Sequence, residues 1–130
     1  MTEQSCFRWG AYLAAISVMV GALGAHFLKT RIRPDLFYAL NVATIMQFFH
    51  AISLILFSNF KSNEIFDKLK GILNIMLAGI LIFSGSIYLL VIRDLSSIEW
   101  LKFFGPITPL GGLLLIYSWI MIALKYNIKK

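Results

Sequence analysis

Four long runs without a charged residue constrain the fold of this chain more than any other feature. Of its 130 residues, 59% are hydrophobic and 14% are charged, and all 12 basic and 6 acidic residues fall outside these runs. A helix needs about 20 apolar residues to cross the hydrocarbon core of a bilayer, and each run reaches that length. The sequence therefore predicts four transmembrane helices. The runs cover residues 9–28, 36–60, 71–92 and 103–124.

The connections are too short for a second domain, since the longest covers residues 61–70. We predict one transmembrane domain over residues 1–130, an all-α polytopic membrane four-helix bundle with short loops. The first run is longer than the apolar part of a signal peptide, and no small-x-small site precedes Lys29, so we expect a retained helix. Pro34 and Asp35 suit a helix start and predict where the second helix begins.

Orientation is predicted from the basic residues near the membrane. The two tails and the second loop carry seven, and the first and third loops carry five. This bias favours both termini inside. Topology and contact with anionic lipid explain the net charge of +6, and we expect no nucleic-acid partner. No transit-like stretch precedes Trp9, which favours a bacterial cytoplasmic (inner) membrane over a mitochondrial one.

Small residues recur at helical spacing in three of the four runs. In lipid, helices associate where small residues let backbones approach closely. The third run, for example, places Asn74, Ala78 and Gly85 on one face. Bundle assembly without any binding site explains such stripes. The glycines that we assign to helix packing are Gly21, Gly24, Gly85 and Gly112.

Polar residues within the runs are the candidate site, because polar groups at membrane depth are costly and often functional. Gln47 and His50 share one face of the second run, and His26 lies near the end of the first. They would either line a cavity or bind a ligand or partner, or form satisfied hydrogen bonds between helices. With Thr108 in the fourth run, the candidate polar site comprises His26, Gln47, His50 and Thr108.

Pro106 and Pro109 interrupt the entry to the fourth helix. Because proline lacks an N–H and restricts the preceding residue, we expect a regular helix from about Pro109, with Thr108 as its N-cap. The preceding Phe103–Thr108 segment would be extended or broken. It should lie at the same membrane face as His26, so Thr108 is a candidate partner for that histidine.

Several functional classes are disfavoured by the sequence. His26 and His50 differ in predicted depth by roughly 18 Å, too far to ligate one haem iron. No Asp or Glu lies within a run, which argues against a proton-coupled carrier of the small multidrug type. Cys6 is the single cysteine, and no catalytic set, phosphate-binding glycine loop or metal-ligand spacing is present. We expect no catalytic residues, cofactor or metal.

Four motifs, in order, resemble those of domain-of-unknown-function family 423: Gly-Ala-Leu-Gly-Ala-His at 21–26, Gln-Phe-Phe-His-Ala at 47–51, Phe-Ser-Gly-Ser-Ile-Tyr-Leu-Leu at 83–90 and Gly-Pro-Ile-Thr-Pro-Leu-Gly-Gly at 105–112. The resemblance implies a small four-helix membrane protein without an agreed activity. Where this family often has a basic residue and an aromatic before the glutamine, this chain has Ile45 and Met46. The positions that the resemblance marks are Gly21, Gly24, His26, Gln47, His50, Ser84, Gly85, Tyr88, Pro106, Thr108, Pro109 and Gly112.

Three functions are compatible with these features. The first is a structural or accessory subunit of a homo-oligomer or of a larger membrane complex. The second is a small permeation or ligand-binding protein with a polar site around His50 and Gln47. The third, an enzyme acting within the membrane, has the least support because no catalytic set is present.

Overall fold

The computed structural model describes residues 1–59 and 63–125, and this part of the chain contains helices and no strand. All four long helical segments are long and apolar enough to cross a membrane, which confirms the predicted fold class. Residue 60, the end of the second predicted span, lies outside the described part. The elements are α1 (Glu3–Leu23), the π-helical η1 (Gly24–Leu28), α2 (Pro34–Ser58), α3 (Asn63–Ser96), the 3₁₀-helical η2 (Glu99–Ile107) and α4 (Thr108–Lys125).

The helix ends follow from local chemistry. Pro34 occupies the start of α2 with Asp35 in its first turn, so the predicted start of this helix is confirmed. Thr2 caps α1, since its side chain accepts a hydrogen bond from the N–H of Ser5. At the end of α3, Ser97 adopts a left-handed conformation with φ of 58°, and its N–H donates to the carbonyl of Arg93 at 2.8 Å.

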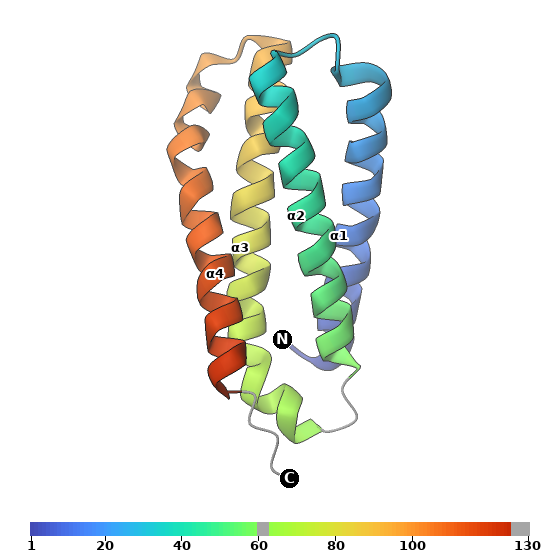
Figure 1. The fold of residues 1–130 in the computed structure, drawn as a ribbon, viewed down its shortest axis with the longest axis vertical. Helices are drawn as coiled ribbons and strands as arrows, with labels where there is room; N and C mark the ends of the chain where they lie inside the picture. Colours follow the sequence, from blue (N-terminus) through green and yellow to red (C-terminus); the bar gives the residue numbers. More distant parts are fainter. Residues whose placement is uncertain (60–62, 126–130) are drawn as a thin grey trace.

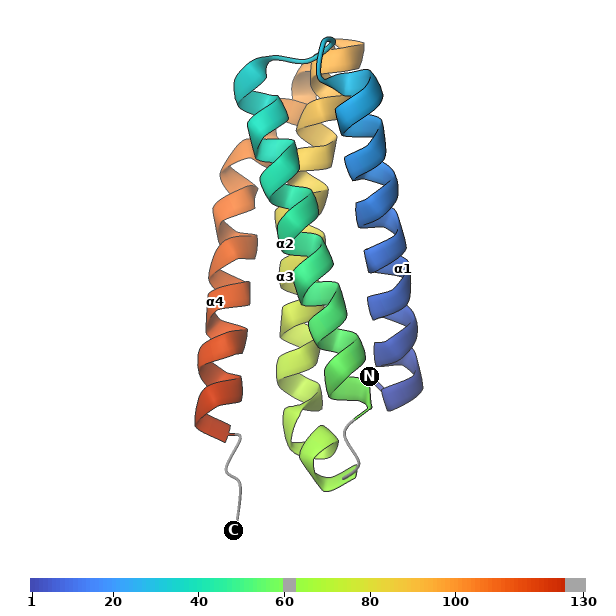
Figure 2. The same cartoon turned by 45° about the vertical axis from the view of Figure 1, so that its right-hand side comes forward.

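The four helices run up and down, and neighbours in sequence pack against each other (Figure 1). Helix α2 contacts α1 and α3, and α3 also contacts α4. In both views α1 and α4 lie on opposite flanks (Figures 1 and 2), and their described residues share no backbone contact. The start of α1 and the end of α4 lie at one end of the bundle. The connections after η1 and α3 lie at the other.

The segment from Asn63 to the third predicted span is helical. Its residues form the first turns of α3, which bend away from the axis of the rest of the helix (Figure 1, light green). Phe66 and Leu69 are buried, while Glu64 and Lys68 form an exposed ion pair at 2.6 Å.

The prediction of an extended or broken segment before Thr108 is wrong. Residues 99–107 form the 3₁₀ helix η2, which contains Pro106, and Thr108 has helical backbone angles rather than those of an N-cap. A 3₁₀ helix accommodates proline because its φ lies close to the value that the proline ring imposes. The Thr108 hydroxyl lies 3.4 Å from the Phe104 carbonyl, to which it donates.

Two apolar clusters form the interior. One, near the chain termini, includes Cys6, Leu54 and Met76, and the other, near the first connection, includes Leu36, Leu40 and Val91. Along α2, residues 43–50 lie between Leu40 of one cluster and Leu54 of the other. The buried polar side chains of α2 are in this interval.

The close backbone approaches involve glycines other than the four assigned from sequence. A Cβ on Gly10 would lie 2.7 Å from the carbonyl oxygen of Ala51, and one on Gly79 would lie 2.9 Å from the Leu115 side chain. Gly111 faces the backbone of Phe83. A Cβ on Gly24 or Gly112 would make ordinary van der Waals contacts, and one on Gly21 or Gly85 would meet nothing within 4 Å. Within one copy of the described chain no neighbouring helix reaches Gly21 or Gly85, so their assignment to helix packing stays a prediction.

Candidate functional site

Gln47 links three helices near the middle of the bundle. Its Nε2 donates to the carbonyl of Leu13 on α1 at 2.8 Å, and its Oε1 accepts a hydrogen bond from the Tyr88 hydroxyl on α3 at 2.9 Å. The Gln47 side chain is buried. Both ends of its amide therefore have partners, as a polar group at membrane depth requires.

His50, one turn further along α2, also uses both polar atoms of its ring. Its Nδ1 lies 2.6 Å from the carbonyl oxygen of Met46, and its Nε2 lies 3.1 Å from Nε1 of Trp119 on α4. A carbonyl oxygen can only accept and an indole N–H can only donate. The hydrogen bonds therefore assign a neutral ring with the proton on Nδ1.

Two buried serines complete what we call the polar layer. The Ser17 hydroxyl on α1 donates to the Thr44 carbonyl at 3.1 Å, and the Ser84 hydroxyl on α3 donates to the Ala43 carbonyl at 3.0 Å. Both hydrogen bonds are accepted by carbonyls of α2, so α2 receives hydrogen bonds from both helices packed against it. The polar layer comprises Ser17, Gln47, His50, Ser84, Tyr88 and Trp119.

The four residues of the candidate polar site do not form one cluster. Gln47 and His50 belong to the polar layer, but Gln47 bonds to α1 and α3 whereas His50 bonds to α4. The Thr108 hydroxyl pairs with the Ser86 hydroxyl at 2.7 Å. His26 is exposed on η1 and makes no hydrogen bond within the described residues, so the predicted contact with Thr108 is not formed. No group of three or more His, Cys, Asp and Glu in the described chain could hold a metal ion.

Sequence reasoning missed Trp119 as a member of the polar layer. We placed no polar role on this indole, yet a depth comparison could have found it. His50 is eight residues before the end of α2, and Trp119 is six before the end of α4. Both helices end at the same end of the bundle (Figure 1). At about 1.5 Å per residue, His50 lies roughly 12 Å and Trp119 roughly 9 Å before the end of its helix.

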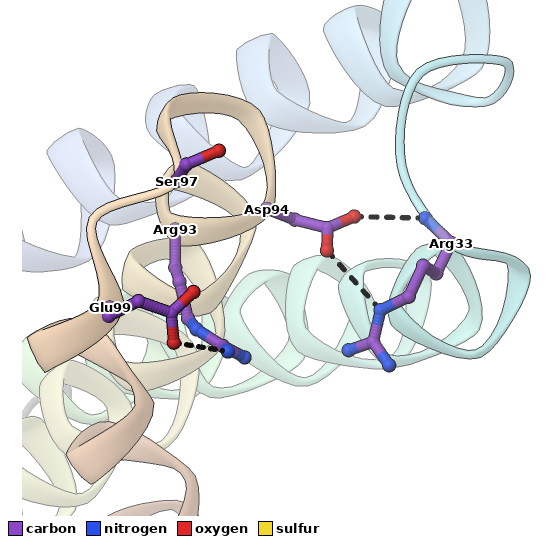
Figure 3. Close-up of a pocket in the computed structure, with 5 residues that line it drawn as sticks. All are labelled: Arg33, Arg93, Asp94, Ser97 and Glu99. Atoms are coloured by element: carbon purple, nitrogen blue, oxygen red, sulfur yellow. Dashed lines mark hydrogen bonds and ion pairs between the residues drawn. The ribbon is translucent and has the colours of Figure 1, made fainter.

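A polar pocket lies at the end of the bundle where α2 begins and α3 ends (Figure 3). Its volume is about 300 Å³. The backbone N–H and the Nε of Arg33 donate to the two Asp94 carboxylate oxygens at 3.0 and 3.2 Å, and Arg93 donates to Glu99 at 3.0 Å. The left-handed Ser97 reverses the chain, so that Glu99 returns to Arg93. This end pocket is lined by Arg33, Arg93, Asp94, Ser97 and Glu99.

The fold and the polar layer define a polytopic membrane protein whose inward polar side chains bond to neighbouring helices. The chain belongs to the family described as "Protein of unknown function (DUF423)", which matches residues 20–112. This match includes all four motifs and confirms the resemblance seen in the sequence.

Named relatives are bacterial membrane proteins. The chain is 37% identical over 126 residues to the UPF0382 membrane protein YwdK of Bacillus subtilis (strain 168), covering 90% of this chain and 94% of that protein. It is 35% identical to the UPF0382 membrane protein SAB0533 of Staphylococcus aureus (strain bovine RF122 / ET3-1), with 88% of each covered. No solved structure matches significantly.

Proposed function

We propose that this chain is a structural or accessory subunit that binds a second membrane helix, from another copy or from a larger complex, in a bacterial inner membrane. The hydrogen bonds of the polar layer support this role over a permeation or ligand site around His50 and Gln47. Both ring nitrogens of His50 and both ends of the Gln47 amide already bond to protein groups. Little polar capacity is left there for a substrate.

The outward face of α3 is the observation that carries the proposal. We use this name for Asn74, Ala78, Leu81, Gly85 and Ile92, which recur at helical spacing on one side of the helix. Leu81 and Ile92 are exposed, and the space beside Gly85 is open. The buried positions of α3, such as Leu73 and Ile80, lie on its other side.

Asn74 makes this face unusual. Its side chain is exposed about one turn inside the predicted third span, and within the described residues its amide makes no hydrogen bond. An amide facing lipid gains a partner when another helix packs on it, and small residues such as Ala78 and Gly85 let that helix approach. A helix that docks here would meet both features at once.

The test is native mass spectrometry of the full chain released from mild detergent. Wild-type protein should retain a second copy or a distinct membrane subunit. Asn74→Leu and Gly85→Leu should release that partner, whereas Ala22→Leu, an exposed position on α1, should not. Since Gly85 faces open space, its replacement should leave the monomer folded. Monomeric wild-type protein without a bound subunit would refute the proposal.

We also propose that both termini face the cytoplasm. The basic residues near the tails and the second loop support this orientation. A reporter active only in the cytoplasm should give signal when fused at either terminus of the full chain. Signal from a fusion in the first connection instead would reverse the assignment.

A further inference from the structure

The end pocket is separate from the polar layer and from the outward face of α3. Its volume of about 300 Å³ lies near the lower limit of ordinary small-molecule sites. Arg33 immediately precedes α2, and Arg93 and Asp94 lie in the last turn of α3. In a membrane these residues lie where apolar spans meet headgroups. Trp100, exposed on η2, is of the type that anchors at this level.

Arg93 has hydrogen-bonding capacity that the protein does not use. A guanidinium carries five N–H donors. In the described chain one of them reaches an acceptor, Oε2 of Glu99. The Nε of Arg93 is fully buried and has no hydrogen-bond partner. A buried donor without an acceptor is costly, so an anionic oxygen entering the pocket would be stabilised there.

Arg33 faces the same opening from the opposite side. Figure 3 shows its guanidinium group extending toward Arg93, while that of Arg93 extends toward Arg33. Arg33 Nε is fixed by Asp94 at 3.2 Å and its Nη1 lies 3.5 Å from a carboxylate oxygen of Asp35, which leaves Nη2 as the terminal nitrogen without a protein partner in the described chain. Planar guanidinium groups bind phosphate oxygens in pairs, and two of them can hold one phosphate from two directions.

The carboxylates of the end pocket decide which phosphate compound fits. Both Asp94 oxygens accept hydrogen bonds from Arg33, whereas Glu99 uses one oxygen for Arg93 and is largely exposed. With Asp35, which lies 3.5 Å from Arg33, three carboxylates outweigh the two arginines, and this balance disfavours a purely anionic ligand. The free oxygen of Glu99 can accept from an ammonium group. A zwitterion matches this pattern.

We propose that the end pocket binds the phosphoethanolamine headgroup of a phospholipid. The phosphate lies between Arg33 and Arg93 and accepts from Arg93 donors that no protein group of the described chain uses. The ammonium group lies against Glu99, and the acyl chains follow the exposed apolar surface at the end of α3, which includes Ile92 and Leu95.

The experiment measures lipid retention by the delipidated full chain in native mass spectrometry. Dioleoyl phosphatidylethanolamine, dioleoyl phosphatidylglycerol and dioleoylglycerol are offered separately at equal concentration. Phosphatidylethanolamine should be retained best and dioleoylglycerol least. Arg93→Gln should weaken its binding about tenfold, as expected for one hydrogen bond to a charged group. Lys102→Gln, an exposed basic residue on η2, should leave it unchanged.

Glu99→Gln tests the ammonium contact, because it removes the negative charge and should reverse the preference in favour of phosphatidylglycerol. Excess inorganic phosphate should not displace the lipid; displacement would identify free phosphate as the ligand and overturn the proposal. Equal retention of phosphatidylethanolamine and dioleoylglycerol would also overturn it, as would full retention by Arg93→Gln. If Arg93→Gln does not fold, Arg33→Gln removes the opposite guanidinium and should cause a similar loss.

Discussion

The indole N–H of Trp119 donates a hydrogen bond to Nε2 of His50, at an N–N distance of 3.1 Å. This hydrogen bond joins α4 to α2. The described residues of these two helices share no backbone contact, because α4 packs mainly on α3. The ring planes are tilted by 58°, so the contact is an edge-on hydrogen bond rather than a stack. This pair therefore adds a direct link between α4 and the other half of the bundle.

Trp119→Phe should destabilise the protein, because the ring is largely kept while the donor to His50 is lost. A loss of about 1 kcal/mol is expected, within the range of hydrogen bonds between membrane helices. Unfolding by sodium dodecyl sulfate in mixed micelles, followed by circular dichroism, measures it. Trp9→Phe is the matched control, because Trp9 is 45% exposed against 43% for Trp119 and has no hydrogen bond in the described chain. Equal effects of the two changes would contradict this role.

His50 should be a neutral imidazole protonated on Nδ1. The Met46 carbonyl can only accept from Nδ1, which leaves the Nε2 lone pair for Trp119. Solid-state NMR of ¹⁵N-histidine-labelled protein in lipid distinguishes protonated from unprotonated ring nitrogens. The Nε2 signal should shift in Trp119→Phe, whereas the Nδ1 signal should change little. A ring protonated on Nε2 would show that the assigned bond to Trp119 is wrong.

Gln47 and Tyr88 should be energetically coupled, because the Tyr88 hydroxyl donates to Oε1 of Gln47 at 2.9 Å. A double-mutant cycle of Gln47→Leu with Tyr88→Phe should give a coupling of about 0.6 kcal/mol, and no more than about 1.7. The same cycle with Tyr38→Phe should give none, since Tyr38 is 72% exposed near the start of α2. Denaturation in mixed micelles measures each variant. Equal coupling in both cycles would contradict the bond.

The four apolar helices could be predicted from sequence because a long run without charged residues marks where a chain can enter lipid. The start of α2 followed from Pro34, whose ring fits a first helical turn. Partners between helices could not be predicted in this way. A glycine permits close approach, but the register of two helices decides whether a neighbour arrives, as it does at Gly79 and not at Gly85.

The polar layer was partly predictable, because a polar residue is easily recognised within an apolar run. Gln47 and His50 stand out in an apolar run, so the sequence identifies them as residues that need partners. The groups that accept from them are the main-chain carbonyls of Leu13 and Met46, which no side-chain pattern reveals. The end pocket depends on the left-handed Ser97, which brings Glu99 back to Arg93. A serine in that conformation has no strong sequence signal.

Two adjacent glycines on α4 should respond oppositely to alanine. A Cβ on Gly111 would meet the backbone N of Phe83 and lie 2.7 Å from its Cα, whereas one on Gly112 would lie 3.7 Å from the Phe83 ring. Because backbone atoms cannot move aside as a side chain can, Gly111→Ala should force α3 and α4 apart and cost about 1–3 kcal/mol. Gly112→Ala should be neutral or stabilise by up to about 1 kcal/mol, the helix-propensity gain of alanine over glycine. The midpoint of unfolding in mixed micelles compares the two variants directly. A Gly111→Ala protein as stable as Gly112→Ala would show that α4 does not pack on Phe83 at this distance.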